Sequence, residues 1–164
     1  MNFQKKKLKE KIGNNVVICI REPKLDPWGR TVAECFIGYE SISSFMVKNG
    51  YACDYVKYSK KKYAKEQEHA KSKKLGIWKM NFESSWEKKW MSLMKKQSLN
   101  LSSFVTIILF TFSFAYSSEK NIAIGKASII DGDTIIISGE KIRFAGIDTP
   151  EKNKVGHEFS KKKT

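Results

Sequence analysis

The sequence predicts one small α+β protein, mainly β, in which five short strands and two or three helices share a single core. Three observations predict this class. Runs rich in β-branched residues surround turn signals at two places, 16–36 and 122–147. Helical periodicity appears between them, at 42–48 and 63–74. The chain has 164 residues, 41% of them hydrophobic, which suits one domain better than two.

Composition limits the partners only loosely. Lys and Arg number 31 against 17 Asp and Glu, a net charge of +14. Such an excess favours a polyanion, either nucleic acid or an anionic membrane surface. Because most of the basic residues are lysines spread along the chain, the charge permits a nucleic-acid substrate without requiring one.

The first 93 residues carry alternating strand and helix signals. Val16 to Glu22 and Thr31 to Phe36 have strand composition around a Pro-Trp-Gly turn. Ile42 to Lys48 is predicted as a short amphipathic helix that an Asn-Gly pair ends. Tyr63 to Lys74 is predicted as a longer helix with a glycine C-cap.

Cysteine usage indicates neither a metal site nor a disulfide framework. Cys19, Cys35 and Cys53 show no CxxC spacing, and with His69 and His157 they form no zinc pattern. An odd number of cysteines argues against a set of disulfides. We therefore expect three buried apolar thiols.

The middle of the chain, residues 94–118, is predicted as a signal-peptide-like segment. An apolar run, Phe104 to Ala115, follows the cationic sequence MKKQ that begins at Met94. The small residues that suit a cleavage site are Ser113 with Ala115, or Ala115 with Ser117. A transmembrane helix is the alternative, although twelve strongly apolar residues are short against the roughly 20 that a spanning helix needs. A buried helix is the third interpretation, and apolar residues all round the helix argue against it.

The last part, residues 119–164, predicts a three-stranded meander. Ile122 to Ile130, Thr134 to Ile137 and Lys141 to Ile147 have strand composition. An Asp-Gly pair and a Ser-Gly pair supply the two turns between them.

Charged side chains cluster around this meander. In the simplest hairpin register Asp133 and Arg143 lie on one face, because side-chain direction repeats every two residues. Asp148 leaves the third strand where its carboxylate can approach that of Asp133. Paired carboxylates favour Ca²⁺ or Mg²⁺ over zinc. Glu151 could take a proton from water, and Arg143 could grip a phosphate.

The stretches DGDT and KIRFAGIDTPE closely resemble the first half of staphylococcal-type (thermonuclease) nuclease domains. This resemblance implies a calcium ion held by Asp133, Asp148 and the carbonyl of Thr149. It also implies that Glu151 activates the attacking water and that Arg143 binds the scissile phosphate.

The first part of the chain resembles the second half of the same domain. DPWGRTVAECF, at 26–36, is similar to the motif of the family's second arginine, with Trp28 at the usual tyrosine and Arg30 as the arginine. VKNGYA at 47–52 and YAKEQEHAKSKKLGIW at 63–78 resemble the closing segments of the domain.

Two further features of this part follow from the resemblance. The sequence FQKKKLKEKIG, from residue 3 to residue 13, resembles the end of the family's first helix. Tyr55 and Tyr58 are candidates to line the nucleotide site, with packing as an equal alternative.

Together the two halves imply a five-stranded OB-fold barrel with helices packed on it, in circularly permuted order. The implied activity is Ca²⁺-dependent hydrolysis of phosphodiester bonds in DNA and RNA. Little sequence specificity is expected, because the contacts are to phosphate. The alternative is a non-catalytic fusion of nuclease fragments, either a nucleic-acid binder or a membrane-tethered remnant. Met94 followed by a signal-like run favours a fusion as the origin.

The apolar segment also determines the predicted location. Residues 119–164 are expected to be secreted or membrane-associated, outside the cytoplasm. Residues 1–93 would stay cytoplasmic if the segment is an uncleaved anchor, with membrane contact through 99–116. A strand-exchanged oligomer is a further possibility for pairing the halves.

Overall fold

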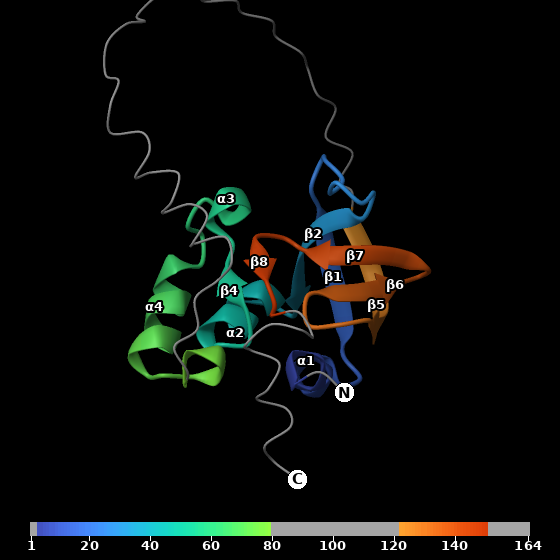
Figure 1. Cartoon of the computed structure of the whole chain (residues 1–164). Coiled ribbons are helices and arrows are strands. Elements are labelled where there is room, and N and C mark those ends of the chain that lie inside the picture. The colour runs from blue at the N-terminus through green and yellow to red at the C-terminus, as the bar shows by residue number, and fades with distance from the viewer. Residues whose placement is uncertain (1–2, 80–121, 151–164) are drawn as a thin grey trace, which may run out of the picture. The chain divides into compact units, whose positions relative to one another are not determined.

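The computed structural model describes residues 3–79 and 122–150, and Figure 1 shows their arrangement. The elements are α1 (Phe3–Ile12), β1 (Val16–Arg21), β2 (Thr31–Ile37), β3 (Glu40–Ser41), α2 (Ile42–Lys48), β4 (Cys53–Asp54), α3 (Val56–Ser59), α4 (Ala64–Ser72), the 3-10 helix η1 (Gly76–Lys79), β5 (Ile122–Ile129), β6 (Thr134–Ile137), β7 (Glu140–Phe144) and β8 (Ile147–Asp148).

Five strands form a closed barrel, in the order β1, β5, β6, β7, β2, with β1 and β2 pairing to close it. Only the β2–β7 pair among these is parallel. The predicted fold class, a five-stranded OB-type barrel with packed helices, is confirmed. The strands come from both parts of the chain, β1 and β2 from the first and β5 to β7 from the second (Figure 1).

Two seams join these parts. Along the first seam β1 and β5 run antiparallel, from the pair Val16 and Lys126 to the pair Ile20 and Ile122. Along the second, β2 and β7 run parallel, with Val32 opposite Arg143. Backbone hydrogen bonds therefore connect residues that are about a hundred positions apart in the chain.

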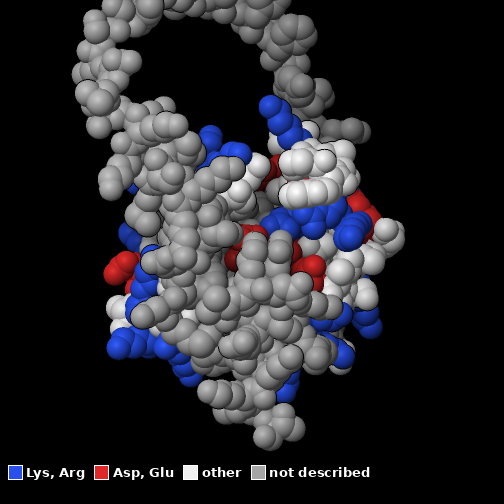
Figure 2. All heavy atoms as spheres, in the orientation of Figure 1, with Lys and Arg blue, Asp and Glu red and all other residues white. Residues whose placement is uncertain are grey.

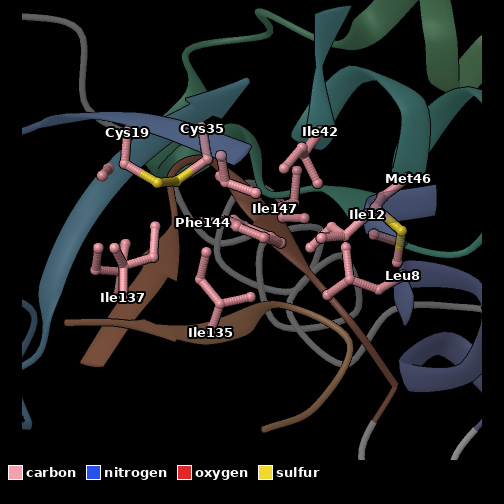
Figure 3. Close-up of a cluster of buried hydrophobic side chains, with 14 of the residues drawn as sticks. Leu8, Ile12, Cys19, Cys35, Ile42, Met46, Ile135, Ile137, Phe144 and Ile147 are labelled. Atoms are coloured by element: carbon pink, nitrogen blue, oxygen red, sulfur yellow. A yellow bond between two sulfur atoms is a disulfide. The ribbon is translucent and has the colours of Figure 1, made fainter. Parts of the chain in front are cut away.

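The core lies between the barrel and two helices (Figure 3). Ile135 and Phe144 point inward from the second part of the chain, and Leu8 from α1 meets them from the first. On α2, Ile42 and Met46 are four residues apart and so share one buried face. Each such fully buried side chain stabilises the fold by roughly 1.5–3 kcal/mol.

The prediction of three free thiols was wrong for two of them. Cys19 and Cys35 are joined by a disulfide, whereas Cys53 is buried and takes no part in it. The antiparallel register places Cys19 directly opposite Cys35, with Cα atoms 4.0 Å apart. Strand register is a tertiary property, so neither the count nor the spacing of cysteines could reveal it.

The third predicted strand of the meander is interrupted. It breaks after Phe144 at a turn in which Gly146 adopts a φ of +69°, and β8 then pairs with β4 instead of continuing the barrel. This small second sheet lies between the helices and the barrel (Figure 1). The predicted Ser-Gly hairpin turn has positive φ at both Ser138 and Gly139, as a type I′ turn requires.

The predicted signal-like segment, 94–118, lies outside the described residues, as do Met94 and Glu151. In residues 3–79 and 122–150, no helix is both long and apolar enough to cross a bilayer. The predictions of location and of membrane contact stay predictions.

Candidate nuclease site

The β6–β7 hairpin brings Asp133 against Arg143. Asp133 directly precedes β6, and Thr134 after it is the register partner of Arg143. One nitrogen of the guanidinium, Nη2, lies 3.0 Å from Oδ2 of Asp133. The backbone N–H of Phe144 also donates to the carbonyl of Asp133, at 2.8 Å. The hairpin thus fixes the backbone of both charged residues.

The turn after β7 returns Asp148 to the same guanidinium. Nη2 of Arg143 donates a hydrogen bond of 3.2 Å to Oδ1 of Asp148. The side chain of Asp133 is 6% exposed and that of Asp148 is 40% exposed. Arg143 therefore bridges a buried carboxylate and a half-exposed one at the surface of the barrel.

Close packing holds the loop between Asp131 and Asp133. A Cβ atom on Gly132 would lie 2.7 Å from Cβ of Gln4 and 3.0 Å from Cγ2 of Thr149. Only glycine fits this contact. The candidate metal ligand Thr149 is itself buried here, next to the loop that carries Asp133.

Sequence reasoning missed Gln4, which α1 places against this loop. Gln4 is buried and lies on the same helix face as Leu8 and Ile12, at intervals of four residues. A polar residue in an otherwise apolar stripe was the available signal. It indicates a helix whose first turn faces a polar site.

Burial raises the pKa of Asp133 to about 7. The Arg143 guanidinium opposes this rise, and the neighbouring Asp131 adds to it. The buried carboxylate is thus short of compensating positive charge. A cation close to Asp133 would favour its ionised form.

The donor set fits a hard cation such as Ca²⁺. The two carboxylate oxygens that contact Nη2 are no more than about 6 Å apart, and a Ca²⁺ ion with bonds of about 2.4 Å holds oxygens up to about 5 Å apart. The two oxygens would therefore have to approach one another to share one ion. Within the described ranges no group of three or more His, Cys, Asp or Glu side chains gathers to form a metal site. The carboxylates of Asp133 and Asp148 meet at Arg143, and Asp131 lies beside Asp133.

The loop before β2 holds Arg30 by means of Asp26. One carboxylate oxygen of Asp26 accepts from the backbone N–H groups of Trp28 and Arg30, each at 2.9 Å. The other accepts from Nε of Arg30 at 2.6 Å. Burial alone would raise the pKa of Asp26, but the hydrogen bonds from Arg30 and Trp28 lower it overall. Asp26 is a second residue that sequence reasoning missed, and an Asp that opens a Pro-Trp-Gly turn was its signal.

Arg30 stands close to Arg143 along the second seam. Val32 is the register partner of Arg143, and Arg30 precedes Val32 by two residues. Strand spacing then puts the two arginine Cα atoms about 8 Å apart. The guanidinium of Arg30 is bonded to Asp26 and stacks near Trp28, 5.2 Å from its ring centre. The parallel pairing of β2 and β7 therefore sets both arginines at one end of the barrel.

The two candidate tyrosines lie beside the turn that leads to Asp148. The N–H of Tyr55 donates to the carbonyl of Gly146 at 2.9 Å. The rings of Tyr55 and Tyr58 meet edge to face, with centres 4.9 Å apart, and Tyr58 is exposed. Their role at a nucleotide site stays a prediction. Glu151, the candidate base, lies three residues beyond Asp148 and outside the described residues.

Figure 2 shows acidic and basic side chains directly beside one another near the middle of the face it presents.

Residues 2–80 match a family model described as staphylococcal nuclease homologue. No curated protein and no solved structure shows significant similarity to the chain.

Proposed function

We propose that the protein is a Ca²⁺-dependent nuclease that hydrolyses phosphodiester bonds of DNA and RNA, because residues 2–80 match the family model of staphylococcal nuclease homologues. The observation that carries this proposal is the guanidinium of Arg143, which contacts both Asp133 and Asp148. Two carboxylates and an arginine at one point supply a place for a divalent cation and a grip for a phosphate.

Each residue has a separate task in the proposed reaction. Asp133, Asp148 and the carbonyl of Thr149 would hold the ion, which supplies charge stabilisation at the phosphate when bound. Arg143 turns from its carboxylate partners toward a phosphate oxygen. Glu151 accepts the proton of the attacking water as the water approaches phosphorus in line, and the 5′ oxygen leaves.

Arg30 supplies the second positive charge. Asp26 fixes its backbone at one end of the parallel β2–β7 pair, near Arg143. Two guanidinium groups then stabilise the charge that accumulates on the phosphate oxygens in the transition state. Since these contacts are to phosphate, we expect cleavage with little dependence on base sequence.

The test is cleavage of plasmid DNA and of RNA by the full chain, in Ca²⁺ and in EDTA. Arg143→Ala should lower kcat by about 10²–10³-fold, as the loss of a transition-state donor does. Glu151→Gln should abolish cleavage while binding of an oligonucleotide persists. Arg21→Ala is the matched control, because Arg21 pairs with Glu140 instead of the two aspartates.

Chelator-sensitive cleavage that Arg143→Ala removes and Arg21→Ala retains supports the proposal. Absence of cleavage in Ca²⁺ contradicts it. Retained binding in that case would favour the non-catalytic nucleic-acid binder.

A further inference from the structure

Four lysines gather in one short segment beside the candidate site. We name residues 57–62 the lysine loop; it spans most of α3 and the turn before α4. Its lysines are all exposed and are Lys57, Lys60, Lys61 and Lys62. None of these four lysines is among the candidate catalytic or metal-binding residues.

The lysine loop is firmly anchored. The hydroxyl oxygen of Ser59 accepts a hydrogen bond from the backbone N–H of Lys61 at 3.1 Å. The backbone carbonyl of Ser59 accepts from the backbone N–H of Lys62, also at 3.1 Å. The next residue, Tyr63, is buried, and its hydroxyl donates to the carboxylate of Glu34. The loop thus presents its lysines from a fixed backbone.

The backbone of the loop is strained at two consecutive lysines. Lys60 has a φ of +53° and Lys61 a φ of +68°, the left-handed region that favours glycine. Each non-glycine residue there costs roughly 1–2 kcal/mol. Lys60 is the C-cap of α3, where a left-handed residue commonly ends a helix.

The charged contacts of the loop distinguish two of its lysines from the other two. Lys62 pairs with Glu34 at 3.2 Å, and Lys57 lies 5.4 Å from the ring centre of Tyr58. No acidic side chain in the described ranges forms an ion pair with Lys60 or Lys61. These two ammonium groups are therefore available to an anion.

The loop touches the turn that joins Arg143 to Asp148. A Cβ atom on Gly146 would lie 2.9 Å from Cβ of Ser59, so the two backbones are in direct contact. Gly146 precedes Asp148 by two residues, about 7 Å along an extended chain. The backbone of the lysine loop therefore lies beside the turn that separates Arg143 from Asp148.

We propose that the lysine loop binds the phosphate backbone of the substrate strand, with Lys60 and Lys61 holding the nucleotides next to the scissile phosphate. This inference rests on the proposed function, because the strand it binds is the strand that is cut. Binding through phosphates gives a longer site without any preference for base.

The experiment measures binding of a fluorescent single-stranded oligonucleotide by anisotropy, in EDTA, over a series of salt concentrations. The variants are Lys60→Gly, Lys61→Gly and the double variant, in the full chain. Each lost phosphate contact should lower the slope of log K against log salt by about 0.7. Glycine accepts a positive φ, so the urea midpoint should stay the same or rise.

Lys74→Gly is the matched control. Lys74 is exposed and has a φ of +50°, so the change removes the same charge from the same backbone conformation. It lies at the other end of α4, about 14 Å from the lysine loop along the helix axis. Its salt slope should equal that of the unchanged protein.

A lower slope for Lys60→Gly and Lys61→Gly with an unchanged slope for Lys74→Gly supports the proposal. Equal slopes in all variants overturn it. An equal loss in Lys74→Gly also overturns it, since net charge alone would then account for binding. Because EDTA prevents cleavage, this result is independent of whether the chain is a nuclease.

A second measurement, made in Ca²⁺, connects the loop to catalysis. The double variant should lower kcat/KM for a long oligonucleotide and leave kcat/KM for a dinucleotide unchanged. A dinucleotide offers no neighbouring phosphate for the loop. An equal loss on both substrates would mean that the loop acts on the scissile phosphate itself and would overturn the assignment.

Discussion

Residues 2–80 and residues 122–150 differ in what they contribute. The first range matches the family model and supplies two barrel strands, the described helices and the Arg30 loop. The second supplies three strands and the two carboxylates that contact Arg143. A family model can thus match one part of a chain while most of the candidate chemistry lies in another.

Neither range closes the barrel alone. β1 needs β5 as its neighbour and β2 needs β7, so each range would expose two strand edges without the other. The core likewise takes side chains from both ranges. The two ranges therefore differ in the chemical groups that they supply, and we expect them to fold together as one unit.

The largest expected effect comes from the removal of Phe144, which is buried in the core and pairs with β2 of the first range. It tests whether the two ranges fold as one unit. Phe144→Ala should lower the free energy of unfolding by about 3–5 kcal/mol because of the cavity it leaves. Urea denaturation followed by circular dichroism and by tryptophan fluorescence should show one coincident transition. Tyr39→Ala, at a fully exposed side chain, should change stability by less than about 0.5 kcal/mol. Two separate transitions would mean that the ranges fold independently.

The disulfide acts within the first range alone. Cys19 and Cys35 are 16 residues apart, and closing such a loop stabilises a fold by about 3 kcal/mol through the unfolded state. A reducing agent should therefore lower the urea midpoint of the unchanged protein. The double variant Cys19→Ala with Cys35→Ala should start from the lower midpoint and ignore the reductant. A midpoint that the reductant leaves unchanged in both proteins would mean that the bridge contributes nothing.

Local sequence signals predicted much of this fold. Ile42–Lys48 is the helix expected from its apolar spacing and Asn-Gly end, and Thr134–Ile137 is the strand expected between two turn signals. The expected proximity of Asp133 and Arg143 is also found, but the register is shifted by one residue from the expected one, since Thr134 is the partner of Arg143 and Asp133 makes its contact from the loop before β6. Where chemistry and geometry are set within a few residues, sequence is sufficient.

Properties that depend on distant residues could not be predicted in this way. The bridge between Cys19 and Cys35 depends on strand register, and the pairing of β4 with β8 depends on a break after Phe144. The hydrogen bond from Arg30 to the carboxylate of Asp26 depends on the conformation of the loop before β2. Each is decided by which segments meet in space, and one sequence does not state that directly.

A smaller stability effect should separate stability from chemistry in the second range. Asp133→Asn removes a buried charge while Arg143 keeps Asp148 as a partner. We expect unfolding to cost roughly 1–2 kcal/mol more at neutral pH, and Ca²⁺-dependent cleavage to be lost. The measurements are urea denaturation and plasmid cleavage. Glu68→Gln, which removes one negative charge at an exposed position of α4, is the control, and lower stability in Asp133→Asn would contradict the account of its burial.

The smallest effect concerns the ion pair that ties the two ranges across the barrel. Glu140 accepts from Arg21 at 2.6 Å and from the hydroxyl of Thr31 at 2.7 Å. The hydrogen bond from Arg21, and then that from Thr31, lower the pKa of Glu140 from its ordinary value of 4.5. Because the folded-state pKa is the lower one, the pair stabilises the fold above pH 4.5 and this stability is lost as pH falls through the folded-state pKa.

Glu140→Gln should therefore lower stability at pH 7 by about 1 kcal/mol, the upper range for a pair this close to solvent. Below pH 4.5 the difference between the variant and the unchanged protein should shrink toward zero, measured as urea midpoints across pH. Glu22→Gln, at an exposed position one residue after Arg21, should change stability at pH 7 by less than about 0.5 kcal/mol. A difference that persists at low pH would mean that the side chain of Glu140 stabilises the seam by packing, and that charge does not tie the two ranges.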